Sequence, residues 1–158
     1  LTLAALAATL RLYRRPEDAE QSVPLLQLLS TSVQNLKNRA ERLAPQLEAA
    51  KSIREATAEQ STAYLGGGSV PTQQIPSWCV ALTPATEAVD ALARALRMGI
   101  PGVFGRIHDD RLLIDLRTVL PDQDMQIVEA LQARSEVPTA SEGVEEEPTT
   151  GSASEEAG

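Results

Sequence analysis

The sequence predicts an α+β fold in which helices cover one face of a small antiparallel or mixed sheet, preceded by long helices. Three observations lead to this prediction. Apolar residues recur at helical spacing over about the first 45 residues, short strand-like apolar runs lie between residues 78 and 116, and helical spacing returns near residue 127. The length of 158 residues and an apolar share of 42% suffice for one modest core.

Two helices are expected at the start of the chain. Leu3, Leu6, Leu10 and Tyr13 recur every three or four residues, which indicates a helix that buries one face and ends at Pro16. From Pro24 the same period continues as a second, longer helix, with apolar positions Leu25, Leu28, Leu29, Val33, Leu36, Ala40 and Leu43. We assign residues 1–50 to this helical segment and residues 51–135 to the α+β domain.

The first half of the α+β domain combines two strands with a glycine loop. Ser52 to Tyr64 alternates weakly and contains alanine where strands prefer β-branched residues, so it predicts an irregular or edge strand. Residues 66–71 have the composition of a loop, and the apolar run 78–82 predicts the next strand. A helix then follows, with Thr86 as its N-cap and Gly99 as its end.

The second half predicts a β-hairpin and a final helix. Residues 103–107 and 111–116 are short apolar strands, and His108-Asp109-Asp110 between them is typical of a tight turn. Asp122 is expected to cap the last helix. Residues 136–158 contain almost only small, polar and acidic residues and no aromatic residue, so they predict a disordered acidic tail.

Charge and cysteine content place few limits on function. The formal net charge is −8, but residues 136–158 hold seven glutamates and no Lys or Arg, so the remaining chain has 15 acidic against 14 basic residues. A nearly neutral body neither indicates nor excludes a nucleic-acid-binding face. Cys79 lies in an apolar run, which favours a buried thiol in the reducing cytoplasm.

The opening apolar stretch is neither a targeting signal nor a membrane span. It covers residues 1–12, which is too short to cross a bilayer, and no basic segment precedes it. Because the chain begins without methionine in a stretch of helical pattern, we expect it to be part of a longer protein.

Three motifs carry a resemblance to a known family. They are Leu1-Thr2-Leu3-Ala4-Ala5-Leu6-Ala7-Ala8-Thr9-Leu10 with Tyr13; Gly66-Gly67-Gly68-Ser69-Val70-Pro71 with Pro76-Ser77-Trp78; and Gly105-Arg106-Ile107 with Asp115-Leu116-Arg117-Thr118-Val119-Leu120. In this order they resemble the bacterial selenocysteine synthases, the L-seryl-tRNA(Sec) selenium transferases, over about residues 1–133. The joint match is far more specific than any one motif.

The resemblance implies the C-terminal small domain of a fold-type-I pyridoxal-phosphate enzyme. Such an enzyme converts seryl-tRNA(Sec) to selenocysteinyl-tRNA(Sec) with selenophosphate, uses pyridoxal 5′-phosphate as an electron sink, and assembles as a cytoplasmic homo-oligomer. Its chemistry needs a lysine in a glycine-rich setting, which neither Lys37 nor Lys51 has. By this resemblance the cofactor lysine precedes Leu1, and the fragment alone is expected to be inactive.

Six residues are candidates for cofactor or substrate binding: Gly66, Gly67, Gly68, Ser69, Arg106 and Arg117. The glycine run allows either an anion-binding concavity or a flexible connector, and the resemblance favours a loop at the active site. Arg117 and Arg106 are expected either to contact the tRNA terminus or to form structural ion pairs, for Arg117 with Asp115.

The other reactive side chains have simpler interpretations. His108 is expected to be a solvated turn residue, because it lacks the convergent partners of a metal or proton-transfer site. The basic residues Arg11, Arg14 and Arg15 fit an ordinary helix end as well as an RNA contact. No metal site is predicted.

Two alternatives to selenium transfer remain open. One is a related pyridoxal-phosphate lyase that acts on an amino acid or amino sugar and shares the architecture without the tRNA. The other is a non-catalytic interaction module. The residues that precede Leu1 would distinguish them, because a lysine in a glycine-rich setting supports an enzyme.

Overall fold

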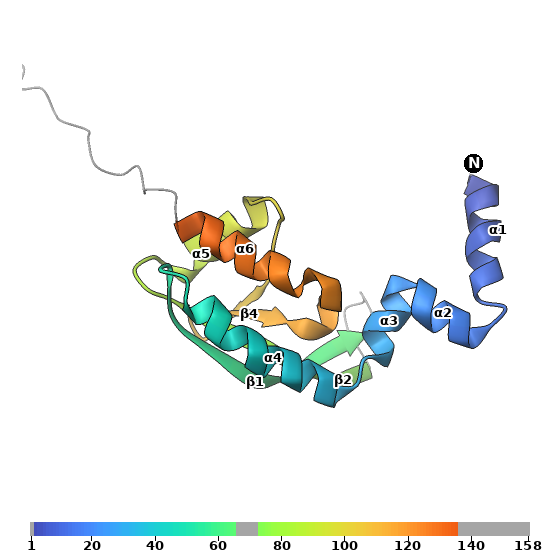
Figure 1. Ribbon diagram of the computed structural model, residues 1–158, viewed down its shortest axis with the longest axis horizontal. Coiled ribbons are helices and arrows are strands. Elements are labelled where there is room, and N and C mark those ends of the chain that lie inside the picture. Colours follow the sequence, from blue (N-terminus) through green and yellow to red (C-terminus); the bar gives the residue numbers. More distant parts are fainter. Residues whose placement is uncertain (1, 66–72, 136–158) are drawn as a thin grey trace, which may run out of the picture.

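The computed structural model describes residues 2–65 and 73–135, shown as a ribbon in Figure 1. Four helices come first, followed by a four-stranded sheet with two further helices, so the α+β prediction is confirmed. In chain order the elements are α1 Thr2–Leu12, α2 Pro16–Ser22, α3 Pro24–Ser30, α4 Val33–Glu48, β1 Ile53–Leu65, β2 Gln73–Pro84, α5 Val89–Met98, β3 Arg106–His108, β4 Arg111–Asp115 and α6 Asp124–Ser135. Two short 3-10 turns, η1 Leu116–Thr118 and η2 Pro121–Gln123, connect β4 to α6.

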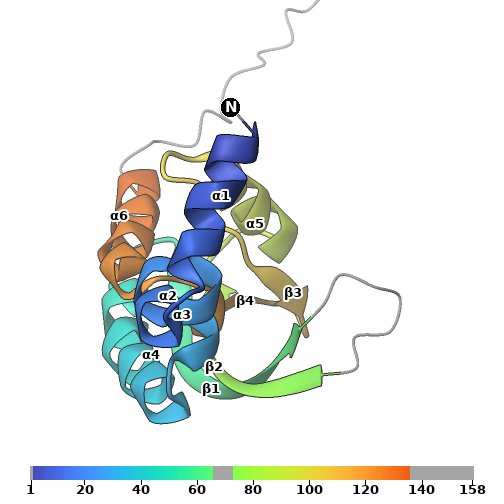
Figure 2. The ribbon, with the colours of Figure 1, turned by 90° about the vertical axis from the view of Figure 1, so that its right-hand side faces the viewer.

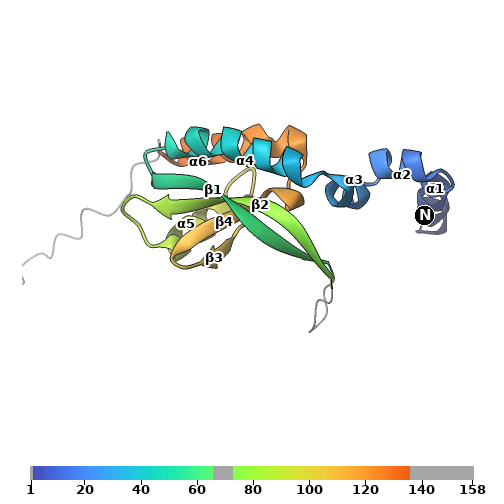
Figure 3. The ribbon, with the colours of Figure 1, turned by 90° about the horizontal axis from the view of Figure 1, so that it is seen from below.

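The sheet is antiparallel throughout, with strand order β1-β2-β4-β3. The strands β1 and β2 form a long ribbon that extends beyond the other two strands (Figure 3). Helices α4 and α6 lie side by side on one face of the sheet (Figures 1 and 3). The predicted layer of helices on one face is therefore confirmed.

One hydrophobic core fills the space between the sheet and its helices. Alternate residues of the two central strands point into it, namely Val80, Leu82, Leu112 and Ile114. The facing side of α4 contributes Leu36, Ala40, Leu43 and Leu47. Buried residues of α5 and α6 join the same cluster, which closes the core. Helix α4 lies within the predicted segment 1–50, yet it shares the core of the predicted domain 51–135. The division of the chain at residue 50 stays a prediction about the longer protein.

Helices α1 to α3 form an arm that extends from one end of the sheet-containing body (Figures 1 and 3), and Figure 2 shows this arm in front of the body. No residue of α1 is buried, and its Leu3 side chain is 81% exposed. The expected helix from Pro24 to Leu43 is wrong as a single element, because it is broken at Thr31 and Ser32. Ser32 accepts a hydrogen bond from the Asn35 backbone N–H at 3.2 Å and thereby starts α4 as its N-cap.

Several predicted boundaries are also corrected. The strand expected to be irregular or at an edge is β1, and its edge position is confirmed; it is long, pairs with β2 from Ile53 to Leu65 and shifts register only near its start. Thr86 does not cap α5; Ala88 occupies that position without a side-chain hydrogen bond. Asp122 lies within η2, so the last helix begins at Asp124.

Asp124 instead forms a buried ion pair that ties α6 to α4. Its carboxylate accepts from Arg39 Nε at 3.1 Å and Nη2 at 2.6 Å, and from Arg42 Nη2 at 2.7 Å. Arg39 also donates to the carbonyls of Leu116 and Val119, at 3.4 and 2.9 Å. A single guanidinium therefore holds α4, η1 and α6 together beside the core.

The β3–β4 hairpin is confirmed, but β3 begins at Arg106 rather than at Val103 and includes His108, so the turn consists of Asp109 and Asp110. Both residues have positive φ, 50° and 54°, as the two central residues of a type I′ turn require. Just before β3, Gly105 lies against β4: an added Cβ would come within 2.7 Å of Leu112 Cδ1 and 2.8 Å of the Leu113 carbonyl oxygen. Glycine is thus needed for this close approach of the two backbones.

None of the helices in the described part of the chain is both long and apolar enough to span a membrane.

Candidate functional site

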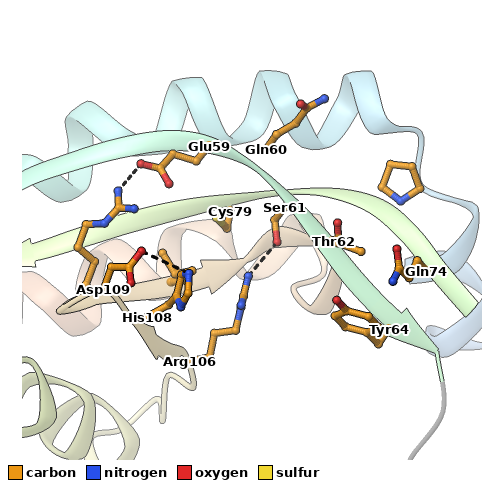
Figure 4. A pocket seen from close by; sticks show the side chains of 13 residues that line it. Glu59, Gln60, Ser61, Thr62, Tyr64, Gln74, Cys79, Arg106, His108 and Asp109 are labelled. Atoms are coloured by element: carbon orange, nitrogen blue, oxygen red, sulfur yellow. Dashed lines mark hydrogen bonds and ion pairs between the residues drawn. The ribbon is translucent and has the colours of Figure 1, made fainter. Parts of the chain in front are cut away.

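The face of the sheet away from α4 and α6 carries polar side chains around an open hollow (Figure 4). The hollow has a volume of about 790 Å³. All four strands contribute to its lining, which includes Glu59, Ser61, Tyr64, Gln74, Cys79, Arg106, His108 and Arg111. The small cluster of Cys79, Ala81 and Leu113 is the buried apolar part of this face. The sheet thus has one apolar face and one largely polar face.

The charged residues around the hollow differ in their partners. Glu59 accepts a hydrogen bond from Arg111, and this contact holds the pKa of the Glu59 carboxyl below its ordinary value despite partial burial. His108 Nε2 lies 3.4 Å from Asp109 Oδ2. Arg106 only approaches the Ser61 hydroxyl, with Nη2 3.4 Å from Oγ, and forms no ion pair within residues 2–65 and 73–135.

A hydrogen-bonded cluster lies beneath Arg106. The Asp115 carboxylate accepts from the hydroxyls of Ser61 and Ser77 and from the backbone N–H of Arg117. Asp115 therefore has three donors, and Ser77 is fully buried. These bonds fix the side chains where β1, β2 and β4 run side by side.

Cys79 lies at the floor of the hollow as a protonated thiol. Burial raises its pKa, and the negative charges of Asp115 and Glu59 raise it further. A nucleophilic cysteine needs the opposite environment, one that stabilises the thiolate. The structure therefore agrees with the interpretation of Cys79 as a small buried residue.

Arg117 points into the protein rather than into the hollow. Its Nη1 donates to the carbonyls of Leu28, Leu29 and Thr31 at 3.2, 3.3 and 3.1 Å. Its Nη2 donates to the carbonyl of Pro76 at 2.6 Å. The residue is only 5% exposed. The guanidinium thus binds the end of α3 and the start of β2, and the expected ion pair with Asp115 is replaced by these carbonyls.

Some of the other residues considered in the sequence analysis lie within the described residues and some do not. Gly66, Gly67, Gly68 and Ser69 lie outside the described residues, so their role stays a prediction. Lys37, on α4, lies 5.5 Å from the centroid of the Trp78 ring and 3.6 Å from Glu41. Lys51 is an exposed residue just after α4.

Neither lysine fits a cofactor imine, which needs an enclosed amine beside phosphate-binding groups. Within the described ranges there is also no group of three His, Cys, Asp or Glu residues placed to hold a metal ion.

Sequence reasoning missed most of the polar face. Of the residues that line the hollow, only Arg106 was singled out for binding, whereas Glu59, Ser61 and Arg111 also line it and Ser77 is hydrogen-bonded to Asp115 beneath it. A signal was present in β1, where Thr57, Glu59 and Ser61 alternate with Ala56 and Ala58. That pattern predicts a strand with one polar face, but the alanine content obscured it.

Comparisons with known proteins point to one family. The model of the L-seryl-tRNA selenium transferase family matches residues 1–120. The L-seryl-tRNA(Sec) selenium transferase of Hyphomonas neptunium is 45% identical over 132 residues, which cover 84% of this chain and 28% of the relative. Those of Moorella thermoacetica and Solidesulfovibrio magneticus are 38% and 40% identical, over 83% and 85% of the chain and 28% and 29% of the relatives. The chain thus spans less than a third of the length of these proteins.

Proposed function

Because the chain belongs to the L-seryl-tRNA selenium transferase family, we propose that it is the C-terminal part of an enzyme that converts seryl-tRNA(Sec) to selenocysteinyl-tRNA(Sec) with selenophosphate. The observation that carries the proposal is the 45% identity over 84% of the chain. We further propose that the complete protein is a cytoplasmic homo-oligomer.

The cofactor of this proposal is pyridoxal 5′-phosphate, held by the length of protein that the relatives have beyond the matched segment. Its chemistry would be the withdrawal of electrons from the seryl group. No step of that chemistry is assigned to this chain, because Lys37 and Lys51 do not fit a cofactor site. The chain alone is therefore proposed to be inactive.

In this proposal the chain supplies a small domain that faces the substrate with its polar side. Arg106 and the run Gly66 to Ser69 are the proposed substrate-binding groups. Arg106 supports this role because its charge has no carboxylate partner in the part of the chain that the structure describes. Arg117 is proposed to act indirectly, by holding α3 and β2 in place.

The test is selenium transfer by a protein of the relatives' full length that includes this chain. Selenocysteinyl-tRNA formation is measured in single turnover with saturating selenophosphate, with and without pyridoxal phosphate. Gly67→Val is expected to lower the rate at least about tenfold, roughly 1.4 kcal/mol in barrier, because a Cβ obstructs a close backbone approach. Arg94→Ala, an exposed change on α5, serves as the matched control and is expected to leave the rate unchanged.

The outcomes separate the candidate functions. Product that depends on both the tRNA and the cofactor supports selenium transfer. Turnover of a free amino acid or amino sugar without any reaction of the tRNA would replace it by the lyase alternative. No turnover and no cofactor binding by the complete protein would favour an interaction module.

A further inference from the structure

We propose that the hollow on the polar face of the sheet binds a nucleotide of single-stranded RNA, with Arg106 on a phosphate and Tyr64 against a base. Given the proposed function, on which this inference rests, that RNA is the unpaired 3′ end of the tRNA substrate. The proposal concerns how the RNA is held and assigns no chemical step to these residues. Three observations support it.

The first observation is the balance of charge. Glu59 is hydrogen-bonded to Arg111, and Asp109 Oδ2 lies 3.4 Å from His108 Nε2, so neither carboxylate on the rim is an ion-pair partner of Arg106. Arg106 is the second arginine on the lining, and its single polar contact within the described ranges is the 3.4 Å approach to Ser61. Its other N–H groups can donate to a ligand, and guanidinium donors match phosphate oxygens.

The second observation is an exposed aromatic ring at the outer end of the hollow. Tyr64 is 56% exposed although it is the largest side chain on the lining. It pairs across the β1–β2 ribbon with Gln74, whose amide can both donate and accept hydrogen bonds. In Figure 4 Tyr64 and Gln74 lie beside Thr62 on one side of Ser61, and Arg106 approaches Ser61 from below. An aromatic ring and amides beside a cation are typical of single-stranded RNA sites.

The third observation is size, which separates two sources of phosphate. Selenophosphate and an RNA phosphate would offer Arg106 similar oxygens. A volume of about 790 Å³ is in the range of sites for whole organic ligands. An anion of the size of phosphate would contact Arg106 but not Tyr64 or Gln74. A nucleotide is large enough to contact the Tyr64 ring, the Gln74 amide and the Arg106 guanidinium together.

The test measures binding of an RNA trinucleotide, CCA, to the 158-residue chain. Fluorescence anisotropy of a 5′-labelled probe gives the Kd as a function of salt. Tyr64→Ala is expected to weaken binding at least about fivefold through loss of stacking, and Tyr64→Phe to retain it. Arg106→Ala is expected to weaken binding and to make the slope of log K against log salt shallower by about 0.7, the value for one phosphate contact on a single strand.

Arg94→Ala is the matched control, because it removes an exposed arginine on α5 and should change neither affinity nor slope. Circular dichroism melts check that each variant is folded. Failure of the wild-type chain to bind CCA, or equal binding by Tyr64→Ala, would overturn the proposal. So would competition by inorganic phosphate or thiophosphate at the same concentration as CCA, which would indicate an anion site. Each of these results could occur while the complete enzyme still transfers selenium, so failure here and failure of the proposed function are distinguishable.

Discussion

Replacement of Asp124 is expected to lower the free energy of unfolding more than the other substitutions of charged residues that we predict. The carboxylate is only 3% exposed and accepts two hydrogen bonds from Arg39, whose side chain is 6% exposed. In Asp124→Ala, Arg39 would keep two carbonyl partners but lose the charge that balances it. Removal of one partner of a buried pair costs about 3–5 kcal/mol, because the other charge stays buried.

Arg42 supplies the matched control. It contacts the same carboxylate at 2.7 Å, yet its side chain is 62% exposed. An exposed partner contributes about 0–1 kcal/mol, so Arg42→Ala should be nearly silent. The contrast between the two variants therefore depends on burial rather than on the number of ion pairs.

Urea denaturation of the 158-residue chain, followed by the fluorescence of its single tryptophan, measures the difference. Trp78 packs against the core, so its emission reports on global unfolding. For a chain of this size, the loss of unfolding free energy expected for Asp124→Ala corresponds to a drop in Tm of roughly 10 °C, at about 2–4 °C per kcal/mol. A loss below about 1 kcal/mol for Asp124→Ala, or equal losses for Asp124→Ala and Arg42→Ala, would refute the reasoning.

Three further predictions concern the other buried or paired groups. Arg117→Ala should lower the free energy of unfolding by about 2 kcal/mol or more, because four carbonyls lose a charged donor, and amide hydrogen exchange should show the loss first in α3. Cys79 should react with a thiol reagent at pH 8 at least about tenfold more slowly in the folded chain than in urea, because burial raises its pKa; equal rates would mean an accessible thiolate. Glu59 has a folded-state pKa below its unfolded value, since Arg111 donates to it, so its contribution to stability is complete above the unfolded pKa and is lost as pH falls through the folded pKa. Glu59→Gln should therefore reduce the acid dependence of Tm, and an unchanged dependence would show that the pair contributes nothing.

Helical periodicity allowed most of the fold to be predicted, and local chemistry decided where that prediction failed. The apolar repeat between Pro24 and Leu43 is continuous in sequence, yet Ser32 caps a new helix within it. Here a side-chain hydrogen bond to the backbone competes with continuation of the helix. For β1, pairing with β2 overrides the low strand propensity of its alanines.

The candidate site was harder to predict than the fold, because its groups come from four strands. The position of Arg106 on a strand next to a turn could be predicted from the Asp109-Asp110 pair. Its proximity to Ser61, 45 positions earlier in the chain, depends on strand order, which the local pattern does not determine. Three of the four partners of Arg117 lie 86 to 89 positions earlier in the chain, and backbone carbonyls carry no residue-specific signal.

Three arginines that look equivalent in sequence have different roles in the structure. Arg106, Arg111 and Arg117 all lie in or just after the two strands of one hairpin. Arg111 is paired with Glu59, and Arg117 is buried against carbonyls, so the donors of both are largely used within the chain. Arg106 retains donors that face the hollow. Loss of activity on substitution of Arg117 would therefore have to be separated from loss of stability, whereas substitution of Arg106 should affect ligand binding while the fold persists.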